Sequence, residues 1–298
     1  MKKLLIVFSI AMLVLAGCSS NEPSGGGIKV YTRDAASGTR EAFSSIIGLE
    51  TMSASAAETT ANGDMAKQVG ATADGIGYVS MSTDLKANKL QAVAYDGVLP
   101  SVETVNDGSY KLARPFSYVS RAKGDFDSAE KEELILAFID YMTLSTEGME
   151  VILSEGGIVD VDKGVAWSTL KSKHPIVDKD NTGLVIKTGG STSVSSTLDA
   201  LMAAFIPMAG NFKYEPNHTG SSDGYKRALG SEKDGVNKID LGFASREFKS
   251  EEKVSDGLVT GAYCLDAVVV VVNEKNQSLK DANAETLNAI FSGEKTQW

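Results

Sequence analysis

Residues 28–43 carry the fold prediction, and they read Ile-Lys-Val-Tyr-Thr-Arg-Asp-Ala-Ala-Ser-Gly-Thr-Arg-Glu-Ala-Phe. The stretch opens with alternating β-branched and aromatic residues, which predicts a strand. Small residues then interrupt the alternation and lead through Ser37-Gly38-Thr39 into the run Arg-Glu-Ala-Phe, which is typical of a helix start. We therefore predict a strand, a tight loop and a helix over this stretch.

The Ser-Gly-Thr turn has the groups that bind an anion. It offers two hydroxyls and several backbone N–H groups at the positive end of a helix dipole. Arg33 lies four residues before Ser37 and could direct a planar, charged fork at the same anion. The alternative is an ordinary N-cap, the usual role of serine and threonine at helix starts. One such loop does not distinguish between the two interpretations.

Two further loops repeat the arrangement. Residues 188–193 read Thr-Gly-Gly-Ser-Thr-Ser and lie between an apolar run and a predicted helix. Residues 220–224 read Gly-Ser-Ser-Asp-Gly and also precede a predicted helix. Three strand–turn–helix units in one chain predict a single oxyanion held among converging helix N-termini.

The N-terminus has the pattern of a targeting segment. Residues 1–17 join a basic start to a short apolar core, which predicts a signal peptide and not a membrane span. The Leu-Ala-Gly-Cys sequence that ends at Cys18 resembles the bacterial lipobox, in which the cysteine carries lipid. The alternative is an ordinary secretory signal with a chance cysteine. Residues 18–27 are polar and glycine-rich, as expected of a flexible tether.

Composition narrows the function classes. A formal net charge of −10 over 298 residues makes nucleic acid an unsuitable partner. If Cys18 carries lipid, Cys264 has no disulfide partner, and its apolar neighbours predict a buried, unreactive thiol. His174 and His218 have no partners at metal-ligand spacing, so we predict neither a metal site nor a cofactor.

Strands that alternate with helices predict an α/β fold. The Val-rich run at residues 266–273 is the most apolar of the mature chain, and we predict it to be a central parallel strand. We predict residues 165–183 to be a connector, because they show weak periodicity and mixed charge. The other predicted helices cover residues 42–47, 63–69, 128–142, 145–153 and 284–291, and further strands cover residues 74–80, 90–95, 110–119 and 239–247.

These pieces together resemble the phosphate-binding lipoproteins that feed phosphate ABC importers. The matching segments are residues 31–40, 76–79, 190–194, 219–224, 240–247, 265–266 and 290–294. The resemblance implies a two-lobed, periplasmic-binding-protein-like (type II) α/β fold and a monomer without enzymatic activity. It also implies inorganic phosphate as ligand, ABC importer permease subunits as partners, and an extracellular location at the bacterial cytoplasmic membrane, anchored through Cys18.

The order of the segments differs from the family's. In the family, the Gly-Ser-Thr-Ser loop comes near the start and the Arg…Ser-Gly-Thr loop comes mid-chain, whereas this chain has the second half first. We interpret the order as a circular permutation, with the family's ends joined through about residues 162–183. One lobe would then comprise residues 28–110 plus 266–298 and the other residues 111–265, with hinges near Tyr110 and Asp266.

The resemblance also implies the ligand set. Phosphate would be held by the three loops and by the end of the strand at residues 239–247, through Arg33, Ser37, Gly38, Thr39, Thr192, Ser193, Ser221, and Ser245 or Arg246. Some family members have an acidic residue where Arg246 stands, and it accepts the proton that distinguishes hydrogen phosphate from sulfate. Candidate substitutes here are Asp34, Asp223 and Asp240. Arg246 could instead be structural and pair with Glu247 or Asp240.

Three other functions remain open. Gly220-Ser221-Ser222-Asp223-Gly224 matches the Gly-x-Ser-x-Gly pattern of serine hydrolases, with Ser222 as nucleophile. That chemistry needs a histidine base, usually after the serine, but no histidine follows Ser222 and His218 lies only four residues before it. A permuted order would leave only His174 as the base. A surface sensor of another oxyanion, uncoupled from transport, and a purely structural surface lipoprotein are the remaining alternatives.

Overall fold

The computed structural model describes residues 26–298, and Cys18 and the predicted signal peptide lie outside them. The large sheet has the strand order β2-β1-β3-β10-β6-β9-β7-β8, with β4 paired to β10, and β11 pairs with β5 in a small sheet. The strands are β1 (Lys29–Arg33), β2 (Ala57–Thr59), β3 (Gly75–Ser80), β4 (Leu90–Ala92), β5 (Ala94–Tyr95), β6 (Ala113–Ser120), β7 (Val185–Gly190), β8 (Lys213–His218), β9 (Leu241–Ala244), β10 (Thr260–Asn273) and β11 (Asp281–Ala282).

Helices cover the faces of the sheet, as an α/β fold requires. They are α1 (Gly38–Ile46), α2 (Asn62–Ala71), α3 (Val102–Asn106), α4 (Ala129–Leu144), α5 (Thr146–Ser154), α6 (Trp167–Leu170), α7 (Ser195–Phe205), α8 (Ser221–Ala228) and α9 (Ala284–Ser292). Within the described part of the chain, no helix is long and apolar enough to cross a membrane.

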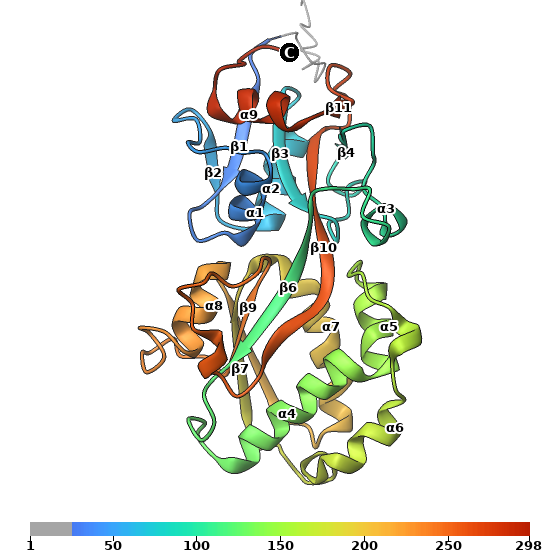
Figure 1. Cartoon of the computed structure of the whole chain (residues 1–298), viewed down its shortest axis with the longest axis vertical. Helices are drawn as coiled ribbons and strands as arrows, with labels where there is room; N and C mark the ends of the chain where they lie inside the picture. Colours follow the sequence, from blue (N-terminus) through green and yellow to red (C-terminus); the bar gives the residue numbers. More distant parts are fainter. Residues whose placement is uncertain (1–25) are drawn as a thin grey trace, which may run out of the picture.

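The molecule has two lobes, one above the other in Figure 1. The terminal lobe contains α1–α3, α9 and β1–β5, and its core includes Phe43, Tyr78 and Phe291, whose rings contact one another. The central lobe contains α4–α8 and β7–β9, and its core includes Phe138 and Phe205. Each lobe therefore has an apolar core of its own.

Two strands, β6 and β10, run from one lobe into the other (Figure 1). They pair with each other, Ala113 opposite Ala267 and Thr260 opposite Val119, and β10 then continues along β3. Both of these pairings of β10 are antiparallel. The prediction of a parallel strand at residues 266–273 is therefore wrong. A strand buried on both faces reads as a continuous apolar run in either direction, so its composition does not reveal its orientation.

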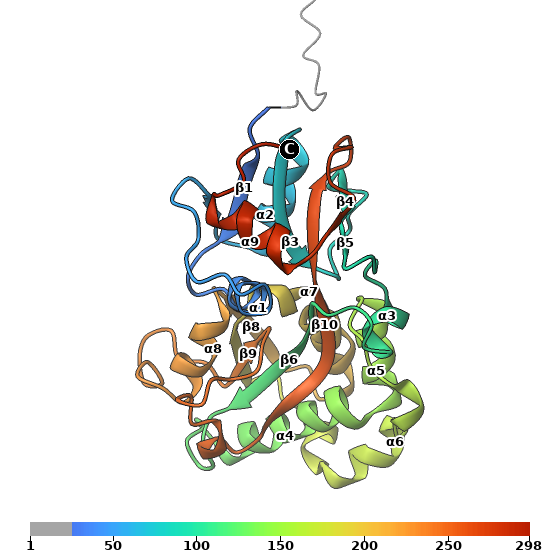
Figure 2. The same cartoon turned by 45° about the horizontal axis from the view of Figure 1, so that its top comes forward.

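The two ends of the described chain lie together in the terminal lobe (Figure 2). Gly27 and Gln297 form an antiparallel bridge, and the Ile28 amide donates to the Thr296 carbonyl over 2.8 Å. The start of β1 and the segment after α9 are thus neighbours in space, although they lie at opposite ends of the sequence.

Three other segments differ from the sequence predictions. The predicted strand at residues 90–95 is broken at Val93, where β4 pairs with β10 and β5 pairs with β11. The predicted connector at 165–183 forms short helical turns, because buried Trp167 packs edge-on against Tyr141 and anchors the segment in the central lobe. Helix α1 begins at Gly38 and not at residue 42, because Ser37 caps it and accepts a hydrogen bond from the Arg40 amide.

Candidate anion-binding site

The hydroxyl-bearing loops predicted from the sequence meet at the boundary between the lobes. The Ser191–Ser193 turn follows β7 and Ser245 follows β9, and the two strands are parallel, so these residues share one edge of the sheet. The Ser191 hydroxyl donates to Ser245 Oγ over 2.9 Å, and the Ser245 amide donates to Ser221 Oγ over 3.0 Å. From the other lobe, Thr39 Oγ1 lies 2.9 Å from Ser193 Oγ.

The close approach of the lobes depends on a glycine. A Cβ atom added to Gly38 would overlap the side chain of Ser221 and would lie 3.2 Å from Arg246 Cγ. The first turn of α1 and the first turn of α8 therefore touch across the lobe boundary. Each of these helix starts carries the positive end of its helix dipole.

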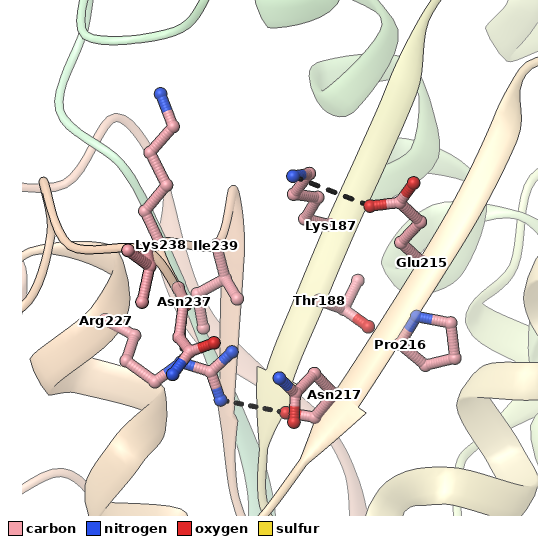
Figure 3. A pocket seen from close by; sticks show the side chains of 10 residues that line it. Lys187, Thr188, Glu215, Pro216, Asn217, Arg227, Asn237, Lys238 and Ile239 are labelled. Atoms are coloured by element: carbon pink, nitrogen blue, oxygen red, sulfur yellow. Dashed lines mark hydrogen bonds and ion pairs between the residues drawn. The ribbon is translucent and has the colours of Figure 1, made fainter.

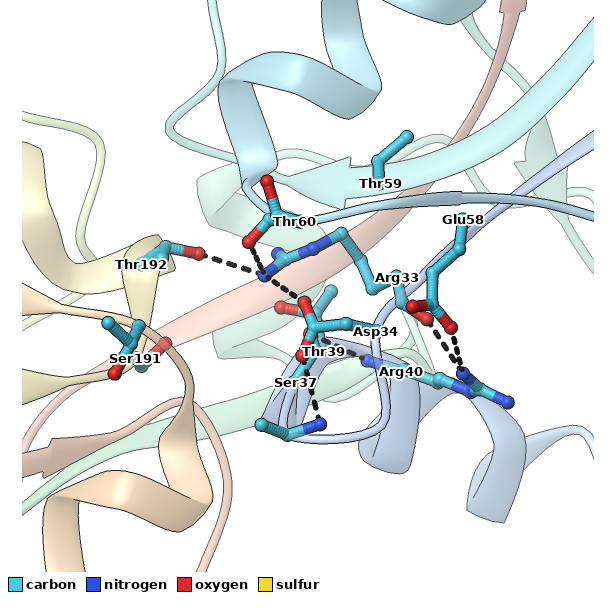
Figure 4. A network of polar contacts seen from close by, with 12 residues as sticks. Arg33, Asp34, Ser37, Thr39, Arg40, Glu58, Thr59, Thr60, Ser191 and Thr192 are labelled. Carbon is cyan, nitrogen blue, oxygen red and sulfur yellow. Dashed lines mark hydrogen bonds and ion pairs between the residues drawn. The ribbon is translucent and has the colours of Figure 1, made fainter.

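Arg33, at the end of β1, is buried and only partly paired (Figure 4). Its side chain is 1% exposed. Its Nη2 donates to the Thr60 carbonyl and to Thr192 Oγ1, each over 3.1 Å, and lies 3.4 Å from Asp34 Oδ2. Its Nε and Nη1 atoms are buried and have no hydrogen-bond partner among residues 26–298.

Such an arrangement costs free energy. A buried donor without an acceptor costs about 1–3 kcal/mol, and more when the group is charged. Burial lowers the pKa of Arg33, although the negative charge of Asp34 opposes that shift. An oxyanion between the loops would provide the missing acceptors for both nitrogens.

Arg246 is placed differently from Arg33. Its Nη1 and Nη2 atoms donate to the two carboxylate oxygens of Glu252 over 2.8 and 3.0 Å, and its Nε lies 2.8 Å from Glu41 Oε2. Burial lowers the pKa of Arg246, but Glu252 and Glu41 outweigh that effect and the pKa is raised overall. Its guanidinium is thus paired with two carboxylates, although Nε meets Glu41 as an ion pair without hydrogen-bond geometry. Glu41 lies in α1, across the lobe boundary.

The three acidic residues considered as proton acceptors lie in different places. Asp34 lies beside Arg33 and accepts a hydrogen bond from the Ala36 amide over 2.9 Å. Asp223 accepts from the Thr219 hydroxyl at the outer side of α8. Asp240 precedes β9, at the opposite end of that strand from Ser245, and pairs with Lys131 over 2.9 Å. Of the three, Asp34 is the one in contact with the guanidinium of Arg33.

Sequence reasoning missed one buried ion pair at the site. Arg114 in β6 donates through Nε and Nη2 to Asp266 Oδ2 in β10, over 3.0 and 2.8 Å. The same Nη2 donates to Ser193 Oγ over 3.3 Å. A signal was present in the sequence, because Arg114 and Asp266 are charged residues in otherwise apolar or extended segments. Their pairing across 152 residues was not readable from it.

A polar hollow in the central lobe is lined by residues of β7, β8 and α8 and of the segment before β9 (Figure 3). Its charged side chains already have partners. Lys187 pairs with Glu215 over 3.5 Å, and the Arg227 Nη1 and Nε atoms donate to the carbonyls of Asn217 and Asn237. This hollow therefore lacks the unpaired donors that mark the region around Arg33.

Neither histidine is placed as the base of a serine hydrolase would be. His218 contacts Thr188 Oγ1 and the Ser191 carbonyl, and His174 contacts Asp140 Oδ2 over 2.9 Å. Within residues 26–298, neither ring has Ser222 as a hydrogen-bond partner, and no group of three or more His, Cys, Asp or Glu could hold a metal ion. Cys264 is a buried free thiol, and burial raises its pKa well above the ordinary value.

The chain thus folds into two α/β lobes that are joined by β6 and β10. A sequence model of the PBP superfamily domain matches residues 15–147 and 171–298. The chain belongs to this superfamily.

The chain is also similar to individual proteins over nearly its whole length. It is 30% identical over 316 residues to the phosphate-binding protein PstS 2 of Streptococcus pneumoniae serotype 4, covering 100% of this chain and 98% of the relative. It is 29% identical to the PstS 2 protein of Streptococcus agalactiae serotype V, covering 96% and 92%. A crystal structure of a phosphate-binding protein of a phosphate ABC transporter from Streptococcus pneumoniae TIGR4 matches with a TM-score of 0.65 at 29% identity, covering 92% of this chain and 98% of that one.

Proposed function

We propose that this protein captures inorganic phosphate between its two lobes and delivers it to an ABC importer. The observation that carries the proposal is the buried guanidinium of Arg33, which has two unpartnered nitrogens at the meeting point of the hydroxyl-bearing loops. The names of the similar streptococcal proteins support phosphate as the anion. Binding would involve no covalent chemistry.

The proposed ligand set uses donors from both lobes. Arg33, Ser37, Gly38 and Thr39 come from the terminal lobe, and the remaining groups are Thr192, Ser193, Ser221 and Ser245. Hydroxyls and backbone N–H groups donate to phosphate oxygens, and Arg33 adds a charge-assisted pair. Arg246 pairs with the carboxylates of Glu41 and Glu252 and not with those of Glu247 or Asp240, the partners expected from the sequence. This pairing still favours a structural role for Arg246.

We propose Asp34 as the acceptor for the proton of hydrogen phosphate. Its carboxylate is 3.4 Å from Arg33 Nη2, whereas the carboxylate of Asp240 is held by Lys131. A carboxylate at the anion disfavours sulfate, which has no proton to donate. Phosphate should therefore bind more tightly than sulfate, and Asp34→Asn should reduce that preference.

The location follows from the N-terminal pattern. We propose that residues 1–17 are removed, that Cys18 carries the lipid, and that residues 18–27 tether the protein to the outer face of the cytoplasmic membrane. The protein would act there as a monomer that docks on permease subunits. Cys18→Ala should release the protein from the membrane fraction or block processing; a fully processed, membrane-bound variant would contradict the lipid anchor.

We propose that residues 28–110 plus 266–298 and residues 111–265 are the two domains, and that their order is a circular permutation. The two apolar cores support the division. The pairing of Ile28 with Thr296 supports the permutation, because a chain can be reopened where its ends are neighbours. A variant with residues 26–298 joined end to end and reopened within 171–183 should fold and bind phosphate with unchanged affinity.

An oxyanion sensor that does not serve transport is the second candidate, since the same site would suit it. Calorimetric titration of the purified protein with phosphate, with sulfate and with buffer alone tests the binding proposal. We expect one phosphate per chain, and a phosphate titration identical to buffer would refute the proposal. Uptake of labelled phosphate by cells with and without the protein separates the importer from the sensor.

A further inference from the structure

Two guanidinium groups, not one, contact the turn after β7. Arg33 Nη2 donates to Thr192 Oγ1 over 3.1 Å, and Arg114 Nη2 donates to Ser193 Oγ over 3.3 Å. Arg33 comes from the terminal lobe, whereas Arg114 lies in β6, which runs between the lobes. The adjacent hydroxyls of one turn are therefore held by two cations from different elements.

The direction of these hydrogen bonds has a consequence for the hydroxyl protons. A guanidinium donates and never accepts, so Ser193 Oγ must be the acceptor toward Arg114. The single proton of the Ser193 hydroxyl is then free to point elsewhere, to Thr39 Oγ1 at 2.9 Å or to an anion in the cleft. Arg33 leaves the proton of Thr192 free in the same way.

Arg114 also keeps an unused donor edge. Its side chain is 2% exposed, and its Nη1 atom is buried without a hydrogen-bond partner among residues 26–298. Both of its contacts with Asp266 go to one carboxylate oxygen, Oδ2. The other oxygen, Oδ1, accepts from the Ser80 hydroxyl over 2.8 Å and from the Met81 amide over 3.1 Å, so Asp266 is held from both sides.

The two cations are close enough to affect each other. Burial is the main cause that lowers the pKa of Arg33, and the positive charge of Arg114 adds to it. Burial likewise lowers the pKa of Arg114, and Asp266 opposes that shift. Two like charges in a buried cleft repel each other, and a negative ligand between them would remove the repulsion.

We propose that Arg114 is a second anion-binding guanidinium of the cleft, whose Nη1 edge donates to the bound oxyanion while Nη2 orients the Ser193 hydroxyl toward it. The inference rests on the proposed function and extends it. Asp266 acts as a positioning residue that fixes the plane of the fork. Two guanidinium groups favour a doubly charged tetrahedral oxyanion over a singly charged one of the same shape.

The test must separate this role from a purely structural ion pair. Removing Arg114 alone would leave Asp266 buried without a counter-charge and could prevent folding. The double variant Arg114→Met/Asp266→Asn removes both charges and leaves the net charge unchanged. Its control is Arg121→Met/Asp125→Asn, which removes a second Arg–Asp pair, 3.1 Å apart and partly exposed at Asp125, just beyond the far end of β6.

Each protein is titrated calorimetrically with phosphate, sulfate and perchlorate, the last a singly charged tetrahedral anion. We expect the double variant to bind phosphate and sulfate at least tenfold more weakly, to lose less affinity for perchlorate, and to unfold at a temperature close to that of its control. The control should bind each anion within twofold of the parent protein.

A folded double variant with parental affinity for phosphate and sulfate would overturn the inference while leaving the proposed function intact. A parent protein that binds none of the three anions would instead refute the proposed function. Arg114→Lys covers the case in which the double variant does not fold. It keeps the charge beside Asp266 but lacks the Nη1 edge, so its phosphate affinity should fall at least threefold, and parental affinity would again overturn the inference.

Discussion

Arg33 and Arg246 are both buried arginines at the lobe boundary, and their surroundings are opposite. Arg246 meets two carboxylates through contacts of 2.8–3.0 Å, whereas Arg33 has a single carboxylate at 3.4 Å and two nitrogens without partners among residues 26–298. Burial alone therefore does not identify a ligand site. The distinguishing feature is unused hydrogen-bonding capacity, because a folded protein rarely keeps a buried charge unsatisfied unless a ligand completes it.

Replacing Arg33 should have the largest effect. Arg33→Met keeps much of the stem but removes the fork, and a charge-assisted hydrogen bond to a buried anion contributes about 1.5–3 kcal/mol. Phosphate affinity, measured by calorimetry, should fall at least tenfold, since about 1.4 kcal/mol corresponds to a factor of ten. Folding should change little, because Arg33→Met also removes the cost of burying a partly paired charge.

Two variants sharpen this result. The phosphate affinity of Arg33→Lys should lie between those of the parent and Arg33→Met, since an ammonium group cannot bridge two oxygens as a guanidinium does. Arg121→Met should leave phosphate affinity unchanged, because Arg121 pairs with Asp125 and Asp234 away from the loops. If Arg33→Met binds phosphate within twofold of the parent, Arg33 is structural and the contrast with Arg246 disappears.

The second prediction concerns the close contact at Gly38. Gly38→Ala places a methyl group against Ser221, so the lobes can no longer meet and donors from one lobe are displaced. Phosphate affinity should fall about tenfold, which is the effect expected when one good charged or bidentate contact with the anion is lost. Gly63→Ala is the control, because a Cβ at Gly63, within α2, meets nothing within 4 Å. Equal affinities for the two alanine variants would show that the cleft tolerates the extra group.

The third prediction concerns the other arginine of the comparison. Glu41→Gln weakens the contact of α1 with Arg246 and with Lys249, while Glu252 still neutralises Arg246. Because Glu41 is 38% exposed, the loss should be small, about twofold to fivefold in phosphate affinity. Stopped-flow fluorescence should show that this loss of affinity comes from faster release of phosphate. Glu50→Gln, an exposed change in the same lobe, is the control, and release as slow as in the parent would exclude a role for Glu41 in holding the lobes together.

The smallest effect concerns His218, a partly buried histidine beside the turn after β7. Burial lowers the pKa of His218 below its ordinary value of 6.5, so the unfolded chain binds more protons there than the folded protein does. The contribution of His218 to stability should therefore be fully present above pH 6.5 and should be lost as the pH falls below that value. Between pH 7 and pH 5, the free energy of unfolding measured by chemical denaturation should decrease less for His218→Gln than for the parent. Equal decreases in the two proteins would assign the acid sensitivity to other groups.

Much of the local architecture was readable from the sequence. The turn at Ser37, the turn at Ser191 and the start of α8 at Ser221 were all predicted as strand–turn–helix units, because their signals lie within a few residues of one another. The buried state of Cys264 was also predicted, from the apolar composition around it. Such features depend on short-range backbone preferences and on hydrophobic pattern.

The orientation of β10, the pairing of Arg114 with Asp266 and the partners of Arg246 were decided by the tertiary structure alone. Each depends on which distant segments become neighbours, and a one-dimensional pattern carries no direct record of that. The Val run would be equally apolar in a parallel or an antiparallel sheet. Likewise, the residues next to an arginine in the sequence do not reveal whether its partners in the fold are carboxylates or a bound anion. The sequence by itself determined which groups could bind an oxyanion. The packing of the lobes decided which guanidinium groups remained free to do so. The reason is that a buried charge can bind a ligand only where the fold gives it too few partners.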